Sequence, residues 1–74
     1  MDERLIALKV AAARYDVASE ASIGAMFNPD REVRMTTRAE AKVAKAELNR
    51  LLDELIASKP DAATAKAAQR YLRI

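Results

Sequence analysis

The apolar positions of this chain recur at spacings of three and four residues, which is the period of an α-helix. Alanine, leucine, glutamate, lysine and arginine dominate the composition, and these residue types favour helix. We therefore expect three helices, over about residues 2–26, 37–58 and 60–73. The pattern predicts an all-α fold, a long helical hairpin followed by a short C-terminal helix, in a single domain spanning residues 1–74.

The joints between these helices are predicted from local signals. A proline disfavours helical backbone at the residue before it, so the pair Asn28–Pro29 should close the first helix. Thr37 and Glu40 are spaced as in a capping box and predict where the second helix begins. Ser58, which precedes a Lys-Pro pair, is expected to cap the third. Residues 19–36 carry weak signals, and the sequence leaves their conformation open.

The first helix carries two apolar stripes on nearly opposite sides. One stripe consists of Met1, Leu5, Leu8, Ala12 and Tyr15, and the other of Ile6, Val10, Ala13 and Val17. A surface helix needs one apolar face, so two faces indicate contacts on both sides. We expect this helix to lie between the other two, or between its own chain and another.

The second helix has an apolar face at heptad spacing, beside an acidic edge. The apolar face is formed by Ala41, Ala44, Leu48, Leu51 and Leu55. Glu40, Glu47 and Glu54 follow one edge, where a parallel helix pair would bring Glu40 to Lys45 and Glu54 to Lys59 of the partner helix. The alternative is a solvated acidic edge beside a face that packs on the first helix.

Bulky apolar side chains are scarce. The sequence is 51% apolar, but 17 of these residues are alanine, which removes little area from water. Ordering a residue costs roughly 1.5 kcal/mol, so a lone monomer of this composition is marginal. We expect a homodimer or a larger helical assembly whose interface includes Ile6, Val10 and Val17. The alternative is a monomer that hides both stripes within its own helices.

Several chemistries have no residues to support them. The chain lacks histidine and cysteine and has one glycine, which excludes disulfides, a zinc site of the usual kind, a histidine-activated nucleophile and a glycine-rich phosphate loop. The three glutamates of the second helix lie about 10.5 Å apart along it, too far to act as an acid–base pair. We expect no catalytic residues, no cofactor and no metal.

Basic residues make nucleic-acid binding the second candidate function. The net charge is only +2, but the positive excess lies in the second half of the chain. Two helix stripes could follow a phosphate backbone, one formed by Arg34, Arg38, Lys42 and Lys45 and the other by Lys66, Arg70 and Arg73. Glutamates lie within the first block, and no aromatic residue is interleaved for base stacking. The alternative for both stripes is a solvated face.

A third surface is the apolar group Ile23, Met26 and Phe27, which either closes the end of the bundle or anchors a protein partner.

No apolar run approaches the roughly 18 residues of a membrane span, and the N-terminus lacks the positive start of a signal peptide. We expect a cytoplasmic protein with no membrane partner. The function expected first is a non-enzymatic protein-interaction module, an adaptor, inhibitor or assembly factor, that acts as a homo-oligomer. The alternative is a small dimeric DNA- or RNA-binding regulator.

Overall fold

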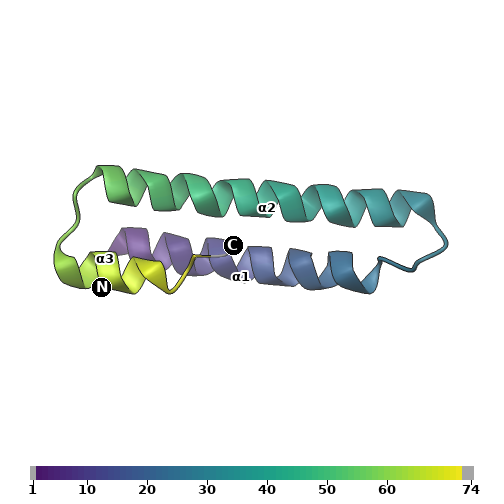
Figure 1. Cartoon of the computed structure of the whole chain (residues 1–74), viewed down its shortest axis with the longest axis horizontal. Helices are drawn as coiled ribbons and strands as arrows, with labels where there is room; N and C mark the ends of the chain where they lie inside the picture. The colour runs from purple at the N-terminus through teal and green to yellow at the C-terminus, as the bar shows by residue number, and fades with distance from the viewer. Residues whose placement is uncertain (1, 73–74) are drawn as a thin grey trace.

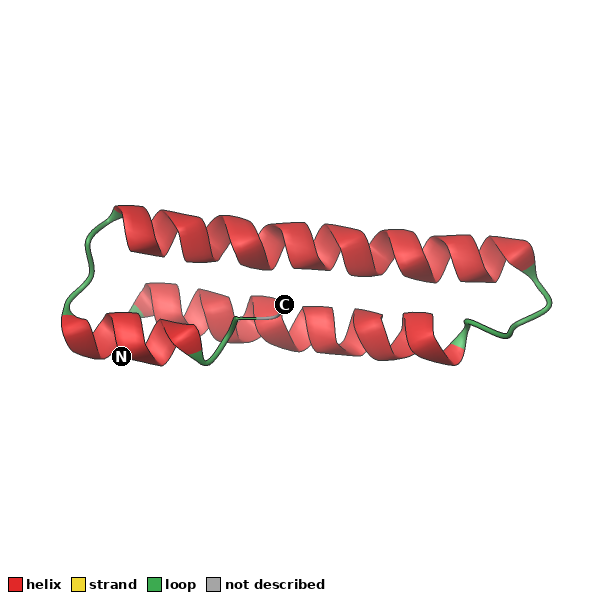
Figure 2. Cartoon of the chain, viewed as in Figure 1, coloured by secondary structure: helices red, strands yellow, loops and turns green. Residues whose placement is uncertain are grey.

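The computed structural model describes residues 2–72, and these form three α-helices and no strand. Helices α1 (Glu3–Gly24) and α2 (Arg31–Ala57) make a long antiparallel hairpin, and the short α3 (Ala62–Gln69) turns back beside α1 (Figure 1, Figure 2). The molecule is elongated, with principal extents of 48 × 19 × 16 Å. The predicted all-α fold, a long hairpin plus a short C-terminal helix, is confirmed.

An aspartate caps the start of each helix. The Asp2 carboxylate accepts from the backbone N–H of Arg4 at 2.8 Å, and the Asp61 carboxylate accepts from that of Thr64 at 2.8 Å. Asp30 accepts from the backbone N–H two residues further on, at 2.9 Å. These bonds satisfy donors that the first turn of a helix leaves without a partner.

The predicted start of the second helix at Thr37 is wrong. Helix α2 begins six residues earlier, because Asp30, just after the Asn28–Pro29 step, supplies a cap there. Thr37 lies inside the helix, where its hydroxyl donates to the carbonyl of Val33 at 2.9 Å. A competent capping sequence therefore lies unused within a longer helix.

The other two boundaries also differ from the prediction. Helix α1 ends at Gly24, and the chain continues in a tighter turn in which the N–H of Asn28 donates to the carbonyl of Ala25 at 2.9 Å. Ser58 ends α2 and does not cap α3: its hydroxyl donates to the carbonyl of Leu55 at 2.6 Å. Lys59 then adopts a left-handed φ of 53°, which turns the chain toward the Asp61 cap.

The core lies at one end of the molecule, where the three helices overlap. The buried cluster consists of Leu8, Ala11, Ala12, Leu48, Leu52, Leu55 and Ala68. Leu5 and Tyr15 pack against it, so the first stripe of α1 faces inward, as predicted. Helix α1 contacts both α2 and α3, but Ile6, Val10 and Val17 of its second stripe stay exposed, so the expected contacts on both sides of α1 are not made within the chain. In the other half of the hairpin, Ala25 is buried, and the described side chains there are otherwise partly or fully exposed.

Candidate interaction surfaces

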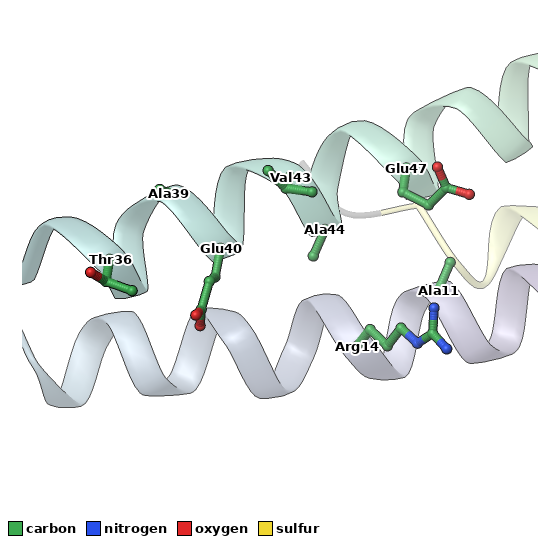
Figure 3. A pocket seen from close by; sticks show the side chains of 8 residues that line it. All are labelled: Ala11, Arg14, Thr36, Ala39, Glu40, Val43, Ala44 and Glu47. Carbon is green, nitrogen blue, oxygen red and sulfur yellow. The ribbon is translucent and has the colours of Figure 1, made fainter. Parts of the chain in front are cut away.

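An apolar groove runs between α1 and α2 on the uncovered part of the hairpin (Figure 3). Its volume is about 580 Å³, and its lining residues are Ala11, Arg14, Thr36, Ala39, Glu40, Val43, Ala44 and Glu47. A second hollow continues it along α1, sharing Arg14 and Glu40 and adding Val10, Ala13, Val17, Ala18 and Ala21. We call the two together the apolar groove.

The groove is open because small side chains line it and no third helix covers it. Val17 and Val43 remain 69% and 70% exposed. Helix α3 packs beside a different hollow, which is lined by Leu52, Leu55, Ala65 and Ala68 among others and shares no residue with the groove. The second stripe of α1 is therefore not buried by the chain itself.

Both charge signs border the groove. Figure 3 shows Glu40 reaching from α2 toward α1, while Arg14 projects from α1 beside Ala11. Glu47 is already partnered, because Arg50 bonds it at 2.5 Å and also bonds Glu54 at 2.6 Å. The hydrogen bonds from Arg50 lower the pKa of Glu47, and the nearby charge of Arg14 adds a smaller effect.

The residues predicted as an interface fall in two separate places. Val10 and Val17 line the apolar groove, and Ile6 is exposed on the same helix outside it. Ile23, Met26 and Phe27 lie at the far end of the hairpin, where the Phe27 side chain is 91% exposed. These residues therefore belong to two separate surfaces.

The predicted basic residues of α2 share one flank of that helix. Their spacing of four, four and three residues keeps Arg34, Arg38, Lys42 and Lys45 on one side. Arg31 extends this row, because α2 already begins there. Sequence reasoning missed Arg31, since it placed the helix start at residue 37. We call the row of five cations the basic stripe.

A separate hollow, of about 460 Å³, opens at the N-terminal end of the basic stripe. It is lined by Ser22, Met26, Arg31, Arg34, Met35 and Arg38. The Arg34 guanidinium donates to the carbonyl of Asn28, which fixes the side chain against the hairpin turn. Lys66 and Arg70 are exposed on or just after α3 and do not line this hollow, and Arg73 lies outside the described residues.

The largest shift of pKa belongs to Asp2, at the start of α1. Hydrogen bonds from Arg4 hold the pKa of Asp2 at about 2, and hydrogen bonds from Thr64 lower the pKa of Asp61. The Arg4 side chain also donates to the Ser58 hydroxyl, which ties the start of α1 to the end of α2. These groups stabilise ends of the fold and converge on no common cavity.

Residues 2–72 contain neither a metal-binding cluster nor a membrane-spanning helix. Over that stretch, no three acidic side chains come together in a way that would hold a metal ion. None of its helices combines the length and the apolar character that crossing a bilayer demands.

Comparisons with known proteins leave the function to be argued from these surfaces. No family model matches the sequence, and no curated protein and no solved structure matches it significantly. The fold and its surfaces define the class: a small helical hairpin, closed by a third helix at one end and open at the other.

Proposed function

We propose that this chain is a non-enzymatic protein-interaction module that acts as a homodimer. Two copies pair through the apolar groove, and the hairpin tip binds a protein partner, as in an adaptor, inhibitor or assembly factor. The observation that carries the proposal is the open half of the hairpin, where two long helices lie side by side with no third element over them.

The apolar groove suits another helix pair. Alanine at six of its positions on the two helices allows close approach, and Val10, Val17 and Val43 supply apolar area that water now covers. Packed helices lie 8–10 Å apart, and small side chains favour the shorter distance. Two hairpins joined face to face form a four-helix bundle, in which each open half covers the other.

The charges at the groove support pairing with a second copy. Arg14 lies on α1 and Glu40 on α2, and both border the same hollow. In a two-fold interface the same patch meets itself, so a residue that contacts a given position is contacted by it in return. Arg14 of one copy then faces the partner's Glu40, and the pair occurs twice.

The tip provides the surface for a different protein. Met26 and Phe27 are exposed beyond the end of α1 and take no part in the groove. Exposed aromatic and methionine side chains are common anchors at protein interfaces. A dimer presents two such tips, which raises its avidity for a repeated partner.

Light scattering over a concentration series tests the dimer. We expect the wild-type chain to dimerise with a dissociation constant of micromolar order. Val43→Asp should give a monomer that retains its helix content by circular dichroism. Ile23→Asp is the matched control, since Ile23 is 64% exposed outside the groove, and this variant should still dimerise. A wild-type chain that stays monomeric well above micromolar concentration refutes the proposal.

Charge exchange tests the pairing geometry. Arg14→Glu and Glu40→Arg should each weaken the dimer, because like charges then face each other across the interface. An equimolar mixture of the two variants should form heterodimers, since every pair in it is again opposite in sign. Effects within one chain cannot be rescued by mixing. Failure of the mixture to associate would contradict the proposed contact.

A further inference from the structure

The basic stripe is long, straight and regularly spaced. Arg31, Arg34, Arg38, Lys42 and Lys45 lie on one uninterrupted helix, and at 1.5 Å per residue the row is about 21 Å long. Arg31, Arg38 and Lys42 are exposed, and the other two are half-buried. Over residues 2–72, none of the five forms an ion pair with a carboxylate.

The carboxylates alongside the basic stripe, from Asp30 to Glu47, lie on a different flank. Asp30, Glu32 and Glu40 line a separate hollow with Thr36, and Glu47 borders the apolar groove. No acidic side chain lines the basic hollow at the N-terminal end of the stripe. The glutamates that interrupt the basic block in the sequence therefore do not interrupt it in space.

The start of α2 adds to the positive potential. The first turn of a helix carries partial positive charge, and cations placed there are unfavourable unless an anion comes close. Arg31 and Arg34 lie in this region, and the capping carboxylate of Asp30 faces the backbone N–H of Glu32. Arg34 uses part of its guanidinium on the carbonyl of Asn28 and keeps further donors for a ligand.

We propose that the basic stripe binds the phosphate backbone of duplex nucleic acid. A small anion needs cations that converge on one point; Arg31, Arg34 and Arg38 share one hollow, but Lys42 and Lys45 continue the row beyond it. Duplex DNA carries one negative charge per roughly 1.7 Å of its axis, so a line of about 21 Å meets several phosphates. The stripe contains no aromatic side chain for stacking bases, which favours a duplex over a single strand.

This site is independent of the proposed dimer. Val43 of the groove and Lys45 of the stripe are two residues apart, which places them roughly 160° apart around a helix. A second copy seated in the groove leaves the stripe open. Failure of dimerisation and failure of nucleic-acid binding are therefore distinguishable outcomes.

Fluorescence anisotropy with a labelled duplex of mixed sequence tests the site. Three to five phosphate contacts predict that raising salt from 50 to 200 mM weakens binding by roughly 40- to 500-fold. Arg38→Glu and Lys42→Glu should each reduce affinity by about tenfold or more at low salt and flatten the salt dependence. Lys9→Glu changes the net charge equally on α1, away from the stripe, and should bind nearly as the wild type does.

Three results would each overturn the inference. Absence of duplex binding at low salt refutes it directly. Equal losses for Lys9→Glu and Arg38→Glu would show that net charge, and not the stripe, governs binding. Vesicles containing phosphatidylserine form a further arm: binding to these vesicles without binding to the duplex would assign the stripe to a lipid surface. Circular dichroism of every variant confirms that the helices are retained.

Discussion

Replacement of Leu48 by alanine measures how much of the fold depends on its few large buried side chains. Leu48 lies on α2 in the core and is fully buried; Leu8 and Leu55 are the other large side chains with almost no exposure. Removing its outer carbons loses about 2.4 kcal/mol of transfer free energy at roughly 0.8 kcal/mol per methylene. The cavity left behind brings the loss to about 3–4 kcal/mol.

This loss is large for a chain of 74 residues, whose total free energy of unfolding is expected at about 4–11 kcal/mol. Urea denaturation followed by circular dichroism at one fixed protein concentration measures the loss of unfolding free energy. In a thermal scan at the same concentration, the melting temperature should fall by more than about 10 °C. Ile56→Ala is the control on the same helix, because Ile56 is 66% exposed and should lose much less. Similar losses in the two variants would refute the burial of Leu48 in the core.

Three further predictions concern the ends of the helices. Asp30→Ala should cost about 1 kcal/mol of unfolding free energy in urea denaturation, and Thr37→Ala much less. A larger loss for Thr37→Ala would show that the helix is capped at Thr37 and not at Asp30. The pKa of Asp2 is about 2 in the fold against an ordinary 3.8, so its stabilisation of α1 is present above pH 4 and lost as the pH falls toward 2; helicity of Asp2→Asn should change less over that range, and identical titrations would contradict this. Ala68→Glu buries a charge and should expose α3 to limited proteolysis, whereas Ala63→Glu, at an exposed position, should not; equal cleavage would exclude packing of α3 through Ala68.

Helix type and the inward face of α1 could be predicted from the sequence, because both follow from periodicity. Leu5, Leu8, Ala12 and Tyr15 repeat at helical spacing, and the structure buries or half-buries all of them. The start of α2 could not be predicted, because Asp30 and Thr37 are both competent caps and local sequence does not rank them. The earlier cap wins, and it adds nearly two turns to the helix.

The candidate sites depended on that boundary. With a start at residue 37, Arg31 and Arg34 belong to a loop, and a count along the sequence places glutamates within the basic block. With a start at Arg31, helix geometry places Glu32 and Glu40 on another flank from Arg38. The apolar groove likewise needed the spatial course of the hairpin, because its lining combines residues of α1 and α2 that periodicity alone does not bring together.

A core confined to one end of a 48 Å molecule makes resistance to local opening uneven along the helices. Amide hydrogens near Leu8 and Leu55 lie within the packed cluster and should exchange with solvent only on global unfolding, whereas those between Val17 and Gly24 open by fraying at far lower free energy. A partner that binds the open half of the hairpin therefore also orders the helices there. Part of the binding free energy is spent on that ordering, so association should carry a larger unfavourable entropy than contact between two rigid bodies.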